Sequence, residues 1–366
     1  MKFIDLYQNV PNKKILLKSI NSLIKNNQFV GGAQVLKFEK KFSKFVNSKY
    51  CISVANGTDA IEIAIESLNL PKNSEAIVPV NTWISTAEAV VRNGLKLIFC
   101  DISLEDYSLD INDLKKKITK NTKLILPVHL YGIPSNMKEI KKISIKNKIK
   151  IVEDCAQAHG TMINKKHVGN FGDLGAFSFF PSKNLGCFGD GGAIITQNKK
   201  LSEICRRIKN HGSLKKYDHK IIGRNSRLDS IQALVLNNKL KYYKNNLNKR
   251  IENANLYLKY LSKIPEIQLY KIKKNSKYSY HQFVIRVKER DKLMIFLKKR
   301  KIETMIHYPY MLNELKIFKN YINKNYKFKN SKNLGKKILS LPVSEDHNKK
   351  DILYVIRNIE NFYNYK

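Results

Sequence analysis

The chain has 366 residues, 43% of them hydrophobic, which is enough to bury the core of a large α/β domain and a smaller second one. Its formal charge of +38 taken alone suggests a nucleic-acid or anionic-membrane partner. The lysines are dispersed, however, and the longest lysine run is Lys115–Lys117. Dispersed charge is typical of a solvated surface rather than of a nucleic-acid footprint. We therefore expect no nucleic-acid partner.

The five cysteines form no CxxC pair, and most lie in apolar, strand-like segments, as is usual for buried thiols in a reducing compartment. The first residues carry no long apolar stretch after their charges, and no run approaches the ~18 apolar residues of a membrane span. We expect a cytoplasmic protein without a membrane partner.

Short apolar runs alternate with helical patterns up to residue 196. Alternation of this kind predicts right-handed crossovers and a mostly parallel sheet. The predicted strands are Tyr50–Val54, Ala76–Val80, Lys96–Cys100, Leu124–Val128, Ile149–Val152, Ala176–Phe180 and Ala193–Thr196, and the predicted helices are Asp59–Leu68, Thr86–Arg92, Ile111–Lys117 and Met137–Lys146. The sheet should therefore have seven strands.

The pattern changes after residue 226. Apolar spacing predicts one long helix over Arg227–Arg250, then a strand over 281–287, a helix over Arg290–Arg300 and a closing helix over Lys350–Tyr363. We expect a large domain over residues 14–240 and a small C-terminal α/β domain over 241–366, on which residues 1–13 would pack.

Polar motifs follow four of the predicted strands, at residues 56–59, 81–83, 154–157 and 181–183. Because ligands of parallel sheets bind beyond the carboxyl ends of the strands, these motifs should converge on one pocket.

Lys183 is the most informative residue among them, because its neighbours in GAFSFFPSKNLGCFGDGGA (175–193) are apolar, small or hydroxyl side chains. A desolvated lysine is more easily neutral, and a neutral amine can attack the aldehyde of pyridoxal phosphate. Asp154 could pair with the protonated pyridine nitrogen or with a lysine, and the Ser178 hydroxyl could hold phosphate.

Other residues leave alternatives open at this level. Gly57 and Thr58 suit an anion site at a helix start, although Thr58 could be an ordinary N-cap residue. Trp83 could stack on a cofactor ring or lie in the core. His159 could be a satisfied polar residue.

Taken together, the motifs ANGTDA, EDCAQAHG, FSFFPSKNLG, GDGGA, GRNSRLDSIQA and IHYP resemble the DegT/DnrJ/EryC1/StrS family of sugar aminotransferases, over nearly the whole chain. The resemblance implies the fold of type I pyridoxal-phosphate enzymes, no metal, and a homodimer with active sites at the subunit interface. Lys183 would be the Schiff-base lysine and proton shuttle, and Asp154 would bind the pyridine nitrogen. The remaining cofactor contacts would be Gln157, Trp83, Gly57, Thr58, Ser178 and, from the other subunit, Asn225.

The implied reaction transfers an amino group from L-glutamate to a nucleotide-linked keto-sugar, in deoxyamino-sugar synthesis for lipopolysaccharide or O-antigen. The run NSRLD (225–229) resembles members that aminate C3 of dTDP-3-keto-6-deoxyhexoses, whereas members acting at C4 of UDP- or dTDP-sugars more often have an aromatic residue at position 226. Arg224 departs from the aromatic residue usual before that Asn. Candidates for binding the sugar and diphosphate are Lys216, Tyr217, His219, His307 and Tyr308, although loop polarity alone would also explain them.

Overall fold

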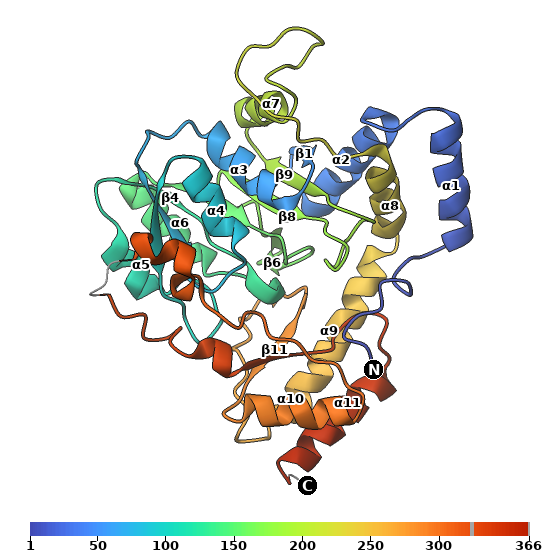
Figure 1. The fold of residues 1–366 in the computed structure, drawn as a ribbon, viewed down its shortest axis with the longest axis vertical. Helices are drawn as coiled ribbons and strands as arrows, with labels where there is room; N and C mark the ends of the chain where they lie inside the picture. The colour runs from blue at the N-terminus through green and yellow to red at the C-terminus, as the bar shows by residue number, and fades with distance from the viewer. Residues whose placement is uncertain (323–325, 365–366) are drawn as a thin grey trace.

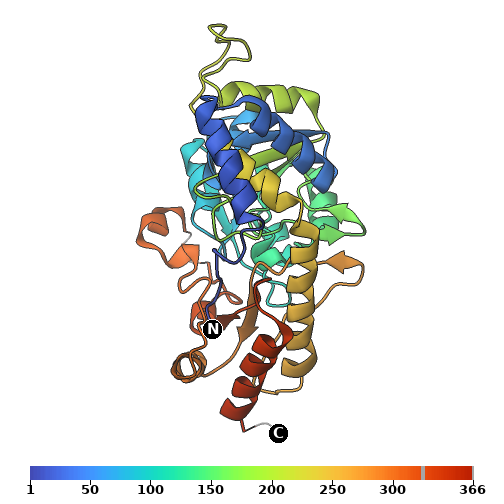
Figure 2. The same cartoon turned by 90° about the vertical axis from the view of Figure 1, so that its right-hand side faces the viewer.

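The computed structural model describes residues 1–322 and 326–364, so the last two residues of the predicted small domain, and 323–325 within it, lie outside the described residues. The upper part of the molecule is a sheet covered by helices on both faces, and the lower part holds the C-terminal elements (Figures 1 and 2).

The element bounds are α1 Lys13–Lys25, α2 Gly32–Val46, β1 Tyr50–Val54, α3 Gly57–Ser67, β2 Glu75–Pro79, α4 Ser85–Arg92, β3 Lys96–Cys100, α5 Ile111–Lys117, β4 Thr122–Ile125, α6 Met137–Asn147, β5 Lys150–Asp154, β6 Met162–Ile163, β7 Lys166–His167, β8 Leu174–Ser178, β9 Gly192–Thr196, α7 Lys199–Ile208, α8 Ser230–Leu240, α9 Tyr243–Leu261, β10 Ser276–Lys277, β11 Phe283–Arg286, α10 Arg290–Lys299, β12 Ile338–Leu341 and α11 Lys349–Phe362. In the described part of the chain, four short 3₁₀ turns lie between them, at Leu130–Gly132, Leu312–Glu314, Lys316–Tyr321 and Leu334–Lys336.

The main sheet has seven strands in the order β1-β9-β8-β5-β4-β2-β3. Strand β9 runs antiparallel to both of its neighbours, whereas the pairs β8–β5, β5–β4, β4–β2 and β2–β3 are parallel. Strands β2, β8 and β9 are buried along their whole length, which explains their continuous apolar runs. The predicted mostly parallel sheet of seven strands is confirmed.

The prediction of one helix over Arg227–Arg250 is wrong. The chain instead forms α8 and α9, separated by a turn at Lys241 and Tyr242. Helix α8 packs along α1 and α2, whereas α9 runs down to pack on α11 (Figure 1). A straight helix could not pack against both sets of partners. The spacing of apolar residues does not record that change of packing partner.

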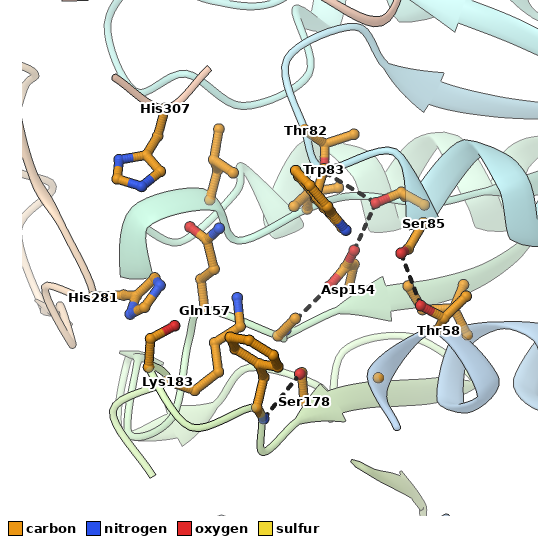
Figure 3. Close-up of a pocket in the computed structure, with 18 of the residues that line it drawn as sticks. Thr58, Thr82, Trp83, Ser85, Asp154, Gln157, Ser178, Lys183, His281 and His307 are labelled. Atoms are coloured by element: carbon orange, nitrogen blue, oxygen red, sulfur yellow. Dashed lines mark hydrogen bonds between the residues drawn. The ribbon is translucent and has the colours of Figure 1, made fainter. Parts of the chain in front are cut away.

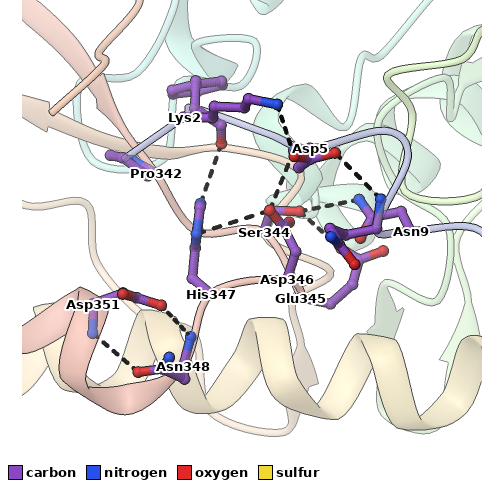
Figure 4. Close-up of polar contacts among 12 residues, drawn as sticks. Lys2, Asp5, Asn9, Pro342, Ser344, Glu345, Asp346, His347, Asn348 and Asp351 are labelled. Carbon is purple, nitrogen blue, oxygen red and sulfur yellow. Dashed lines mark hydrogen bonds and ion pairs between the residues drawn. The ribbon is translucent and has the colours of Figure 1, made fainter. Parts of the chain in front are cut away.

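The N-terminal segment lies against the C-terminal elements (Figure 4). Glu303 donates its N–H to the Met1 carbonyl, and Asp5 donates its N–H to Asp346 Oδ2. One cluster of buried apolar side chains runs from Val78 of the sheet through Tyr131 to Val355 of α11. The upper and lower parts therefore share a core, and the domain boundary at residue 240 stays a prediction. No described helix is long and apolar enough to cross a bilayer.

Candidate active site

A cavity of about 400 Å³ opens where strands β1, β2, β4, β5 and β8 reach their carboxyl ends (Figure 3). The turn after β1, the start of α4, the end of β5 and the segment after β8 all line it, so the polar motifs that follow separate strands do meet. The lining includes Asn56, Gly57, Thr58, Thr82, Trp83, Ser85, Thr86, Asp154, Gln157, Ser178, Lys183, His281, Gln282, His307 and Tyr308.

One end of the cavity has the features of a phosphate cradle. Helix α3 begins at Gly57, and the Asn56 side chain caps it by accepting the Asp59 N–H at 2.8 Å. A Cβ added at Gly57 would lie 2.6 Å from Ser178 Cβ, so only glycine lets the helix start approach the end of β8. Backbone N–H groups at a helix start, with the Thr58 and Ser178 hydroxyls nearby, suit a dianionic group.

The Asp154 carboxylate lies in the middle of the cavity without a cation. It accepts the Thr86 hydroxyl at 2.8 Å and the Ala156 N–H at 3.0 Å, and it forms no ion pair with any described residue. Burial raises its pKa above the usual range. A buried carboxylate of this kind is stabilised by a cationic ligand, and the protonated nitrogen of a pyridine ring is one.

The Lys183 amine faces the same space. Burial lowers the pKa of Lys183 from 10.5 to about 8, and the negative charge of Asp154 limits that fall. At neutral pH roughly a tenth of the amine is therefore unprotonated, compared with well under a thousandth at the ordinary lysine pKa. The geometry supplies the nucleophilic amine that an aldehyde cofactor needs.

Gln157 and Trp83 flank the space above Asp154. Gln157 accepts the Tyr131 N–H at 2.6 Å and donates to the Tyr308 hydroxyl at 3.0 Å, which leaves one amide hydrogen free. The rings of Trp83 and Tyr308 lie 5.6 Å apart. Trp83 is 57% exposed, so it is not a core aromatic.

The predicted substrate residues divide into two groups. His307 and Tyr308 line the cavity. Lys216, Tyr217 and His219 lie on the loop between α7 and α8 that projects from the top of the molecule in Figure 1, and Tyr217 is 81% exposed. Asn225, at the base of that loop, is also exposed and does not line the cavity of its own chain.

Arg224 anchors the base of this loop. Its guanidinium pairs with Glu62 and, at 2.7 Å, with Glu66, both on α3. Two residues further on, Ser226 is buried and accepts the Ala55 N–H at 3.1 Å. The charged residue at position 224 thus fixes the loop to the helix that starts at the phosphate cradle.

Sequence reasoning missed several lining residues. Thr82, Ser85 and Thr86 follow β2. Their position after the end of a strand was the sequence signal that could have identified them as lining residues. His281 and Gln282 come from the segment before β11, and nothing in their local sequence indicates that this segment reaches the cavity that contains Lys183. His159, by contrast, is fully buried against Phe177 and Phe179, and neither of its ring nitrogens has a partner among the described residues.

A buried His129, Glu153 and Cys155 cluster lies behind the site. Glu153 accepts hydrogen bonds from His129 and from the N–H groups of Gly169, Phe171 and Gly172. Its oxygens are thereby used within the protein, which indicates a structural role rather than a metal centre.

Comparison with known proteins agrees with this geometry. The sequence pattern of the DegT/DnrJ/EryC1/StrS aminotransferase family matches residues 12–360. The chain belongs to this family. It is 37% identical over 361 residues to the dTDP-3-amino-3,6-dideoxy-alpha-D-galactopyranose transaminase of Aneurinibacillus thermoaerophilus, covering 98% of this chain and 99% of the relative.

Solved structures of family members have the same fold. The crystal structure of DesV from S. venezuelae superposes with a TM-score of 0.96 at 31% identity, covering 100% of this chain and 99% of DesV. NtdA from Bacillus subtilis, solved with bound pyridoxamine phosphate, has a TM-score of 0.92 at 28% identity and covers 100% of this chain and 85% of that protein. This protein is a pyridoxal-phosphate-dependent sugar-nucleotide aminotransferase of the type I fold, as the sequence predicted.

The residues present fit that cofactor. The uncompensated Asp154 carboxylate suits the ring nitrogen, the narrow approach at Gly57 suits the phosphate, and the largely desolvated Lys183 suits the aldehyde. When bound, the cofactor supplies an electron sink for breaking bonds at the carbon that carries the amino group.

Proposed function

We propose that this enzyme transfers the amino group of L-glutamate to C3 of a dTDP-3-keto-6-deoxyhexose and so makes a dTDP-3-amino-3,6-dideoxyhexose. The observation that carries the proposal is the end-to-end similarity to the Aneurinibacillus thermoaerophilus transaminase. Ser226 supports it, because the buried position holds a small residue bonded to Ala55, where C4 enzymes more often have an aromatic.

We assign each step to a residue of this chain. Lys183 Nζ takes the proton from the Cα of glutamate, and in the second half-reaction it delivers a proton to the sugar carbon that receives nitrogen. The Asp154 carboxylate keeps the cofactor ring nitrogen protonated throughout. Glutamate leaves as 2-oxoglutarate before the sugar enters, so the two substrates use one cavity in turn.

We further propose a homodimer in which the projecting loop completes the partner's site. Four large apolar side chains of the loop are exposed in one chain: Leu214, Tyr217, Ile221 and Ile222, the last by 93%. Exposure of this kind on one short loop is typical of an interaction surface. The same loop carries Lys216 and leads to Asn225. Both residues are predicted to contact a phosphate group of a bound ligand, and neither lines the cavity of its own chain.

The decisive test is the structure of the product. Purified enzyme is incubated with L-glutamate and the 3-keto and 4-keto isomers of dTDP-6-deoxyglucose, prepared with 3,4-ketoisomerases, and the product is analysed by NMR. We expect nitrogen on C3. Nitrogen on C4 would replace the C3 assignment with a C4 aminotransferase, and no aminated sugar from any nucleotide would refute the proposed function.

A further inference from the structure

His281 lies in the cavity wall opposite the phosphate cradle. It precedes β11 and lines the cavity next to Gln282 and His307 (Figure 3). Arg250 fixes its backbone: the guanidinium, paired with the buried Glu345, donates to the carbonyls of Tyr280 at 3.2 Å and His281 at 3.5 Å. The imidazole is therefore held by a rigid segment and is not a mobile surface group.

The hydrogen-bond chain around His281 fixes the position of its ring proton. Asn184 donates its amide to the Ser279 carbonyl at 2.8 Å, and a carbonyl can only accept. The other atom of that amide, Asn184 Oδ1, must then accept, and it lies 3.0 Å from His281 Nδ1. His281 consequently carries its proton on Nδ1, and Nε2 presents a lone pair.

The charge state keeps that lone pair available. Burial, together with the positive charges of Lys183 and Arg250, lowers the pKa of His281 well below its ordinary value. The ring is neutral at physiological pH, and Nε2 has no hydrogen-bond partner among the described residues. It is a free acceptor in the wall of the cavity.

A second unused acceptor lies beside it. Gln282 lines the same cavity, is 5% exposed, and its Oε1 accepts no hydrogen bond in the described part of the chain. A buried polar atom without a partner is uncommon in a folded protein. Both acceptors lack a donor among the described residues, but only His281 Nε2 is open to the cavity, because Gln282 Oε1 is shielded from solvent.

The His281 acceptor discriminates between the two substrates. A sugar ring carries hydroxyl donors, whereas the carboxylates of glutamate are acceptors only. Lys183 is the single cation among the described residues that line this cavity, and Arg250 behind His281 is already paired with Glu345, so this wall offers a carboxylate no free positive partner. The wall is built for a polyhydroxyl ligand.

Resting on the proposed function, we propose that His281, held in the Nδ1–H form by Asn184, accepts a hydrogen bond from a sugar hydroxyl on a carbon adjacent to the keto carbon. His281 is thus a specificity-determining residue for the second half-reaction, and Asn184, which follows the reactive lysine in sequence, is its positioning residue.

The test separates the two half-reactions. Single-turnover rates are followed by the absorbance change of the bound cofactor, first with glutamate and then with the keto-sugar nucleotide, in the wild type, His281→Leu and His281→Gln. Loss of a neutral hydrogen bond should slow the sugar half-reaction of H281L about tenfold more than its glutamate half-reaction. The H281Q variant, which keeps an acceptor, should recover part of that loss.

A double-mutant cycle is completed with keto-sugar nucleotides that lack the hydroxyl on one carbon next to the keto carbon. With one of these deoxy analogues the wild type should slow by a similar factor, and H281L should show no further penalty. Equal slowing of both half-reactions in H281L would overturn the assignment. So would rate losses from the substitution and from the missing hydroxyl that simply add for every analogue. If H281L fails to fold, H281Q with the analogues decides, because the analogue should then slow H281Q by a smaller factor than the wild type, and an equal factor would overturn the assignment. A wild type that aminates no keto-sugar refutes the proposed function instead.

Discussion

Gly57 approaches Ser178 so closely that a Cβ on the glycine would lie 2.6 Å from the serine Cβ. The contact joins the start of α3 to the end of β8, and Lys183 follows that strand by five residues. The proposed phosphate cradle and the segment that carries Lys183 are therefore fixed to each other.

Gly57→Ala should consequently weaken cofactor binding. The added methyl must push α3 away from β8, and overpacking of this kind costs about 1–3 kcal/mol, which corresponds to about 5- to 150-fold in affinity if the strain falls on the bound form. Titration of the apoenzyme with pyridoxal phosphate measures the effect. Gly189→Ala is the matched control, because a Cβ there meets the movable end of Gln232 at 3.0 Å. Equal affinities of G57A and the wild type would contradict the cradle assignment.

The pH dependence of cofactor capture should reflect Lys183. Its pKa is lowered to about 8, and the neutral amine is the reactive form, so the rate of capture should rise about tenfold per pH unit below pH 7 and level off above pH 8. Stopped-flow absorbance of the apoenzyme gives the profile. Lys183→Ala should develop no visible band at any pH, whereas the exposed control Lys199→Ala should behave as the wild type. A rate still rising at pH 10 would contradict the lowered pKa.

The same pKa has a consequence for the stability of the apoenzyme. Between pH 8 and 10.5 the unfolded chain keeps the Lys183 proton that the folded protein has released. The contribution of Lys183 to the free energy of unfolding therefore rises with pH across this window, and below pH 8 its buried charge is a constant cost. Denaturant titrations of the wild type and K183A, compared across the window, isolate this contribution.

Asp154→Asn should show what the charge of this side chain contributes, because asparagine keeps its shape and removes its charge. Removing the carboxylate removes the interaction that raises the Lys183 pKa, so the midpoint of the capture profile should move to lower pH. Turnover should fall about a hundredfold or more, because the ring nitrogen of the bound cofactor would lose its carboxylate partner, and breaking a buried charge pair costs about 3–5 kcal/mol. Both readouts come from one preparation. A midpoint that moves upward would mean that Asp154 acts on Lys183 through something other than its charge.

Mixing two inactive variants should show which subunit supplies Asn225. After subunit exchange between Lys183→Ala and Asn225→Ala proteins, each mixed dimer would contain one intact site if Asn225 acts on the partner. Half of the dimers are mixed and each has one good site of two, so activity should recover to about a quarter of the wild type. If Asn225 serves its own chain, no intact site forms and the mixture stays inactive. Unmixed variants at the same total concentration are the control.

The elements around the cofactor were predictable because local patterns carry them. Strands such as Tyr50–Val54 and Lys96–Cys100 are apolar runs bounded by turns, and their bounds match the structure. Asp154 and Lys183 are each preceded by a buried strand, so their presence at one sheet edge follows from the rule that parallel strands end together. The long helix failed because amphipathic spacing does not record where α8 leaves α2 and α9 begins its course to α11.

The sequence by itself thus determined the sheet, the family and the cofactor, and it predicted the amine that would react with that cofactor, since each depends on residues in short contiguous motifs. Only the tertiary structure decided that His281 and Gln282 reach the cavity, that Asn184 fixes the proton of His281, and that Arg224 fixes the projecting loop to α3. Those contacts join residues far apart in the chain, and a local pattern cannot encode them because they form only when distant segments pack together.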